Sequence, residues 1–236
     1  MMPAPRVEID LKKIHHNASA LVERLASRGI SVTSVTKATL GSAEIAKALI
    51  DAGVSALGDS RIENIEAMRL AGVAAEMTLI RSPMLSQTEQ VVEHSDVSFN
   101  TEIEVIKRLS QEARKRQRTH GVVLMVELGD LREGIMPKDL RETVGETLRL
   151  PNIFFKGIGT NLACRCGVSP DASNMAELSN IADLIEETFD LKMEIVSGGN
   201  SANLEWALSG AETGKINNLR LGEAILLGCE TLHRQP

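Results

Sequence analysis

Short β-rich apolar runs recur along the chain, and each is followed by a longer segment with helical periodicity. The first run is SVTSVT at residues 31–36. Runs of four to eight such residues are typical of strands buried on both faces. The pattern therefore predicts eight strands, at residues 31–36, 55–58, 77–80, 97–99, 122–128, 154–159, 193–197 and 216–221, with an extra N-terminal strand, RVEID, at 6–10.

The segments between these runs are predicted to be helices. Three begin with the S/T-x-x-E signature of a capping box, which satisfies the first free amides of a helix. The pairs are Ser60 with Glu63, Ser86 with Glu89, and Thr101 with Glu104. The helix expected over 101–117 carries an apolar face, as a helix that covers a barrel requires, made of Ile103, Ile106, Leu109 and Ala113.

Eight strand–helix units in 236 residues favour a parallel (β/α)8 TIM barrel, an α/β fold, over an open doubly wound sheet. The run GIGTNL at 157–162 also lacks the third glycine of the dinucleotide-binding fingerprint, because Leu162 stands in its place. No linker-like or low-complexity stretch divides the chain. We therefore expect one domain over residues 1–236.

Composition narrows the function classes. The 26 basic and 32 acidic residues give a net charge of −6, which is no footprint for nucleic acid. No apolar run approaches the ~18 residues of a membrane span, and the N-terminus lacks a signal-peptide core. The three cysteines form neither a disulfide framework nor the usual zinc spacing. We expect a cytoplasmic protein without a metal site and without a membrane or nucleic-acid partner.

Polar residues follow each predicted strand. In a TIM barrel the loops after the strands form the functional face, so these residues would converge on one mouth. The clusters are Lys37, 59–61 (DSR), 81–82 (RS), 100–102 (NTE), 129–133 (GDLRE), 160–161 (TN), 198–201 (GGNS), and Arg220 with Gly222.

The last two loops have the composition of a phosphate site. Barrels often bind phosphate there through backbone amides and a helix N-terminus. SGGNSAN supplies two glycines and Ser201, and LRLGEA supplies the amides of Gly222 and Glu223.

Lys37 ends a run that looks like a buried strand, although cores exclude ammonium groups unless they are paired or used. A desolvated lysine amine opposite a phosphate cradle suits a Schiff base with pyridoxal 5′-phosphate (PLP). The alternative is a lysine that snorkels to solvent or pairs with a carboxylate such as Asp59.

Six motifs stand in order from about residue 6 to 230: VTKATLG, GDSRIEN, VELGDLREGI, GIGTNLAC, SGGNSANL and NNLRLGEAILLG. Together they resemble the alanine racemase family of fold-type III PLP enzymes, and its ornithine racemase branch most of all. The resemblance implies a PLP-dependent amino-acid racemase. Proton exchange at Cα would pass through a Lys37 aldimine, with Lys37 also acting as one of the bases.

The resemblance also implies roles for other residues at the mouth. Arg220 would hydrogen-bond the pyridine nitrogen and keep it unprotonated, which restricts the chemistry to proton exchange. Arg132 would act near the phenolic oxygen and the substrate carboxylate. Ser201, with the amides of Gly222 and Glu223, would hold the phosphate.

Two departures from alanine racemases favour ornithine over alanine as substrate. Asn161 would contact the cofactor where those enzymes place a histidine against the pyridine ring, and Met125 replaces a lysine. A carboxylate at the mouth could meet the distal ammonium of ornithine. Asp59, Glu102 and Asp130 are the candidates, and the sequence does not choose among them.

Racemases of the family carry a C-terminal β domain whose tyrosine reaches across a dimer as the second base. This chain has no tyrosine, and we expect that domain to be absent from residues 1–236. Cys164 could sit at the mouth as a substitute. The histidines are expected to be solvated, namely His15, His16, His94, His120 and His233.

Three explanations of the missing base stay open. The chain could be a fragment of a longer racemase. It could be a one-domain PLP-binding homeostasis protein without turnover. The second base could also come from a partner chain, as in a homodimer, or from water.

Overall fold

The strands close into one parallel barrel. The structure, a computed structural model, describes residues 7–163 and 167–236. Within them the strand order is β1 to β8 in sequence, and β8 pairs with β1 to close the ring. The predicted (β/α)8 barrel is therefore confirmed. The strands are β1 (Ser31–Val35), β2 (Ala56–Asp59), β3 (Met77–Leu79), β4 (Val97–Asn100), β5 (His120–Val126), β6 (Ile153–Thr160), β7 (Ile195–Ser197) and β8 (Asn218–Leu221).

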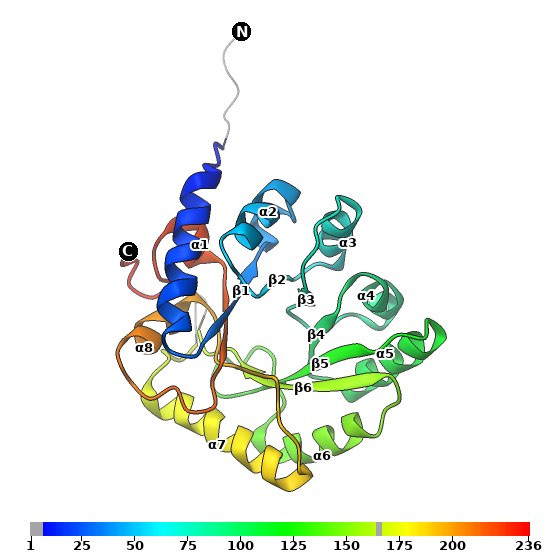
Figure 1. Cartoon of the computed structure of the whole chain (residues 1–236). Helices are drawn as coiled ribbons and strands as arrows, with labels where there is room; N and C mark the ends of the chain where they lie inside the picture. The colour runs from blue at the N-terminus through cyan, green and yellow to red at the C-terminus, as the bar shows by residue number, and fades with distance from the viewer. Residues whose placement is uncertain (1–6, 164–166) are drawn as a thin grey trace.

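Helices alternate with the strands and lie around the outside of the barrel (Figure 1). In the part of the chain that the structure describes, no helix combines the length and apolarity needed to cross a membrane. The helices are α1 (Leu11–Ala26), α2 (Ala43–Asp51), α3 (Ile62–Leu70), α4 (Thr88–His94), α5 (Ile103–Lys115), α6 (Pro137–Leu148), α7 (Ala172–Phe189), α8 (Leu204–Leu208) and α9 (Glu223–Leu227), with 3-10 turns η1 (Lys37–Thr39), η2 (Leu85–Gln87) and η3 (Ser201–Asn203).

The expected N-terminal strand is wrong in the part of it that the structure describes. Residues 7–10 form no strand, and α1 begins at Leu11. The carboxylate of Asp10 accepts hydrogen bonds from the amides of Lys12 and Lys13 at 3.0 and 3.2 Å. A helix cap needs extended backbone, which Asp10 has, so a segment with strand-like alternation serves as the start of a helix.

The three predicted capping boxes are also wrong, although their helices form. No side chain caps α3, α4 or α5. Before α3, the carboxylate of Asp59 accepts the amide of Arg61 at 2.9 Å. Before α5, the hydroxyl of Thr101 lies 3.0 Å from that of Ser82. Thr101 thus joins two neighbouring loops at the barrel mouth, whereas Asp59 bonds Arg61 within its own loop. A local sequence signature reveals neither contact.

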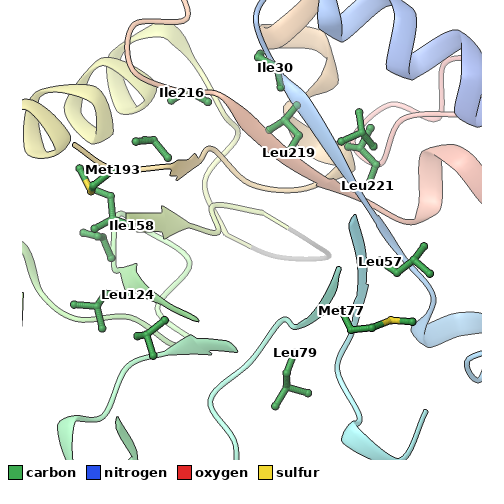
Figure 2. Packing of buried hydrophobic residues seen from close by; sticks show 14 of the residues in the cluster. Ile30, Leu57, Met77, Leu79, Leu124, Ile158, Met193, Ile216, Leu219 and Leu221 are labelled. Carbon is green, nitrogen blue, oxygen red and sulfur yellow. The ribbon is translucent and has the colours of Figure 1, made fainter. Parts of the chain in front are cut away.

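Apolar side chains pack on both faces of the strands. Val122 and Leu124 belong to the large cluster between the strands and the helices, part of which Figure 2 shows. Val123 and Met125 belong to a small cluster with Phe99. Because successive strand residues face opposite ways, this alternation places the small cluster inside the barrel. Burial of both faces explains the near-continuous apolar runs in the sequence.

A polar chain also crosses the barrel interior. Arg220 donates to the Ser197 hydroxyl at 2.6 Å, which donates to Oδ1 of Asn218 at 2.7 Å. Asn218 donates in turn to the Thr33 hydroxyl at 3.0 Å. All four side chains are buried. Such linked hydrogen bonds stabilise one another in a low dielectric, so the network fixes the position of Arg220.

His120 is buried at the start of β5, so its expected solvation is wrong. Its Nε2 lies 2.8 Å from the hydroxyl of Ser98. Burial lowers the pKa of His120 from 6.5 to about 4, because the charged ring loses its hydration. The other four histidines are exposed or half-buried.

Acid should destabilise the fold through His120. The unfolded chain binds a proton on this residue as the pH falls through 6.5, whereas the folded chain resists protonation down to about 4. Stability present above pH 6.5 is therefore lost across that window, by about 3 kcal/mol of unfolding free energy. We expect urea unfolding to show a steeper loss for the wild type than for His120→Gln. Parallel pH profiles would contradict this assignment.

Candidate functional site

A cavity of about 520 Å³ opens at the carboxyl ends of the strands. Its lining residues locate the cavity at this end of the barrel, since Lys37 follows β1, Asn161 follows β6 and Gly222 follows β8. The cavity brings together all the site residues predicted from the sequence, which are Lys37, Arg132, Asn161, Ser201, Arg220, Gly222 and Glu223.

Lys37 lies at the rim of this cavity, and its side chain is exposed rather than desolvated as the sequence led us to expect. β1 ends at Val35, and Lys37 begins the turn η1. Leu40 and Gly41, with φ of 53° and 67°, then reverse the chain. Among the described residues, none forms a hydrogen bond or an ion pair with the Lys37 ammonium. The amine is therefore available to a ligand in the cavity.

The alternative partner of Lys37, Asp59, is occupied by other donors. Its carboxylate is buried and accepts the Thr36 hydroxyl at 2.8 Å. The Arg61 amide and the Asn64 side-chain amide donate to its other oxygen at 2.9 and 3.0 Å. An ion pair between Lys37 and Asp59 is therefore wrong. Asp59 instead fixes the end of β1 against the start of α3.

The loop after β7 is shaped by its second glycine. Gly199 has φ of 143°, and a Cβ there would lie 2.1 Å from Oδ1 of Asn203, so only glycine fits. The turn places Ser201 next to the last loop of the barrel, where its hydroxyl accepts the amide of Ala224 at 3.1 Å. One hydrogen bond thus joins the loops that follow β7 and β8.

Three backbone amides in these two loops have no acceptor in the part of the chain that the structure describes. Within residues 7–163 and 167–236, no backbone or side-chain acceptor pairs with the amides of Ser201, Gly222 and Glu223. Free amides at the start of successive turns form a cradle for an anion such as phosphate. Amides without acceptors therefore occur in the two loops where the Gly-Gly and Leu-Gly-Glu motifs predict a phosphate site.

Arg220 lies at the base of the cavity. Its guanidinium donates to the Thr160 carbonyl at 2.8 Å and lies 4.9 Å from the centre of the Phe99 ring. Burial lowers the pKa of Arg220 from 12.5 to about 10, an effect that the charge of Glu133 opposes. The group therefore stays cationic at neutral pH, and it presents N–H donors but no acceptor.

Asn161 and Arg132 share a carboxylate on the loop after β5. The Asn161 amide donates to Asp130 at 2.8 Å, and its oxygen accepts Asn200 at 2.7 Å, which fixes its orientation. Arg132 is half-exposed and pairs with Asp130 and Glu133, each at 3.3 Å. Arg132 is thus held at the rim by two carboxylates.

The described lining of the cavity is more basic than acidic. The basic side chains are Lys37, Arg81, Arg132 and Arg220, and the acidic ones are Glu133 and Glu223. This excess favours an anionic ligand. Arg81, Glu133 and Asn200 also line the cavity. The sequence placed them in strand-end clusters but did not single them out, because it does not show which way a loop side chain points.

Comparison with known proteins gives consistent matches. The family model described as the alanine racemase N-terminal domain matches residues 9–229. The ornithine racemase of Acetoanaerobium sticklandii is 38% identical over 230 residues, which are 97% of this chain and 65% of that protein. The lysine racemase of Thermotoga maritima is 39% identical over 228 residues, which are 96% of this chain and 63% of that protein. The chain thus spans less than two thirds of the length of either relative.

Among solved structures, PipY of Synechococcus elongatus PCC7942, with PLP bound, shares the fold. Its identity is 20% with a TM-score of 0.73, and the match covers 90% of this chain and 99% of PipY. The family match covers nearly all of the barrel and every predicted site residue. This chain belongs to the alanine racemase N-terminal domain family.

Proposed function

We propose that this chain supplies the cofactor-binding barrel of a PLP-dependent amino-acid racemase of the ornithine or lysine type. The observation that carries the proposal is the single cavity in which the unpaired Lys37 amine, the unpaired amides of Ser201, Gly222 and Glu223, and the buried Arg220 guanidinium occur together. The ornithine and lysine racemases that resemble the chain support this choice of substrate class.

The residues present fit PLP. Its phosphate would accept the free amides of Ser201, Gly222 and Glu223, which otherwise lack acceptors among the described residues. Its aldehyde would meet the Lys37 amine, the one lysine side chain in the described lining. Its pyridine nitrogen would accept from Arg220, which can only donate.

PLP supplies, when bound, an electron sink for the charge that develops at the substrate Cα. Lys37 holds the cofactor and then moves the Cα proton on one face. Arg220 limits how far the sink operates, because a donor that stays cationic keeps the pyridine nitrogen from taking up a proton. Arg132, half-exposed at the rim, orients the substrate through its α-carboxylate.

Racemisation needs a second proton-transfer group on the opposite face of Cα. The described lining contains no histidine or cysteine, and Cys164, the candidate from the sequence, lies outside the described residues. We therefore include in the proposal a homodimer in which a second copy completes the site.

A PLP-binding protein without turnover is the second candidate function. The observation in its favour is the match to PipY, a structure with PLP bound, which covers 99% of the PipY length. The two candidates differ at the substrate Cα. A racemase exchanges the Cα proton, whereas a protein that only carries PLP is expected to leave it in place.

Exchange at Cα separates the two candidates. The chain, loaded with PLP in deuterium oxide, should replace the α-proton of L-ornithine and L-lysine and erase their optical rotation. We expect slower exchange with L-alanine. Loss of the α-proton signal in proton NMR measures the rate, and PLP without protein is the control. If the chain binds PLP but exchanges the α-proton of none of the three amino acids, the racemase proposal is wrong and the carrier function is supported.

A further inference from the structure

Two carboxylates line the cavity within the described part of the chain, and they are bonded differently. Glu223 is fully engaged: one oxygen accepts the Thr231 hydroxyl at 3.0 Å, and the other pairs with Arg234. Glu133 pairs through Oε1 alone, with Arg132 at 3.3 Å. No other described residue forms a hydrogen bond or an ion pair with its carboxylate, and the side chain is 29% exposed. Glu133 therefore has an oxygen available to a ligand.

The loop that carries Glu133 is held at both ends. The backbones of Glu127 and Ile135 bond at 2.9 Å, and Ile135 also bonds the Met125 carbonyl at 2.8 Å. The carboxylate of Glu127 accepts the amide of Leu131 inside the loop at 3.1 Å. Gly134, with φ of 155°, packs so closely that a Cβ would lie 2.6 Å from the Glu127 amide nitrogen. The backbone thus presents Glu133 to the cavity from a fixed position.

The three acidic residues proposed from the sequence are poorer partners for a substrate cation. Asp59 is fully buried and has three donors. Asp130 is 6% exposed and is engaged by Asn161 and Arg132. Glu102 is exposed before α5 but does not line the cavity. Glu133 is the remaining carboxylate that is both in the cavity and only partly paired.

We propose that Glu133 recognises the distal ammonium of a diamino-acid substrate. On binding, Glu133 would release Arg132 and pair with the substrate ammonium instead. The inference rests on the proposed function. In the free protein Arg132 pairs with Glu133 and also with Asp130 at the rim. A diamino acid replaces this internal pair with two external ones, its α-carboxylate on Arg132 and its distal ammonium on Glu133.

This exchange would give selectivity in two ways. It adds an ion pair for a diamino acid, and it leaves Glu133 without its ion-pair partner when a neutral amino acid binds. A neutral amino acid of the same length also draws Arg132 onto its α-carboxylate. It then leaves the Glu133 carboxylate without its ion-pair partner in a partly desolvated cavity, which is unfavourable. A diamino acid gives both Arg132 and Glu133 a new partner, while Asp130 keeps its hydrogen bond from Asn161. The geometry therefore favours ornithine or lysine over their neutral analogues.

The test uses L-ornithine and L-norvaline, which share a five-carbon skeleton but differ in the distal ammonium. Calorimetry on the PLP-loaded chain should show ornithine binding about tenfold to a hundredfold more tightly than norvaline. Glu133→Gln should abolish this preference, mainly by weakening ornithine. The KM for ornithine in the exchange assay should rise in parallel, with a smaller change in kcat.

Glu102→Gln is the matched control, because it makes the same substitution near the mouth but outside the cavity, and it should keep the preference. A wild-type chain that binds both amino acids equally would overturn the inference. So would an equal loss of affinity for both in Glu133→Gln, since Glu133 would then act only by positioning Arg132. A chain that prefers ornithine but exchanges no α-proton would support the Glu133 site while refuting the racemase.

Discussion

Lys37→Ala should lower the rate of α-proton exchange with L-ornithine by at least about 1,000-fold, since the same amine holds the cofactor and moves the proton. Its effect on folding should be small. The Lys37 side chain is exposed and has no partner among the described residues, so the free energy of unfolding should change by no more than about 0.5 kcal/mol. Proton NMR in deuterium oxide measures the rate, and urea unfolding measures the stability.

Lys47→Ala is the control for this variant. Lys47 is also exposed but lies on α2, outside the lining of the cavity, so its loss should leave the exchange rate unchanged. An unchanged rate in Lys37→Ala would show that another group does the chemistry. A large loss of stability would show that Lys37 is a structural residue.

Arg220→Met should lower the exchange rate by at least about 100-fold with little effect on stability. Burial lowers the pKa of this guanidinium to about 10, so keeping it charged at neutral pH costs about 3 kcal/mol in the folded state. Methionine removes that cost and also removes the hydrogen bonds to Ser197 and Thr160. The two effects nearly cancel, and we expect urea unfolding to differ from the wild type by no more than about 1.5 kcal/mol.

Arg69→Met makes the same substitution at a structural arginine. Arg69 pairs with Asp96 and donates to the carbonyls of Ala75 and His94, away from the cavity. It should lose about 2 kcal/mol of stability and keep its activity. If Arg220→Met instead proved the less stable of the two and kept its exchange rate, Arg220 would be a structural residue without a role at the cofactor.

The barrel was predictable because its signals are local. Each strand is buried on both faces, so each appears as a short β-rich run, and the eight runs lie close to the observed strands. The errors occur where one local sequence pattern is compatible with two different structures. Residues 7–10 alternate as a strand would, but the extended backbone at Asp10 caps α1. Thr101 has the sequence signature of a helix cap, but its hydroxyl bonds Ser82 on the neighbouring loop.

That the predicted residues would line one cavity was also predictable, because parallel strands bring all their carboxyl ends to one face. Side-chain contacts across that face were not. The exposure of Lys37 follows from a turn that begins two residues after β1 ends. The burial of His120 follows from the start of β5, two residues earlier than expected. Glu133 and Asp130 are close in sequence, and only the loop geometry shows which of them lines the cavity.

Covalent attachment of PLP to Lys37 is the claim on which the proposed chemistry depends. The PLP-loaded chain should be reduced with borohydride, digested and analysed by mass spectrometry. We predict that the peptide carrying Lys37 gains the mass of one reduced cofactor, and that free inorganic phosphate, competing for the amides of Ser201, Gly222 and Glu223, slows the loading. A cofactor mass on another lysine, or no adduct on a chain that still binds PLP, would contradict the account.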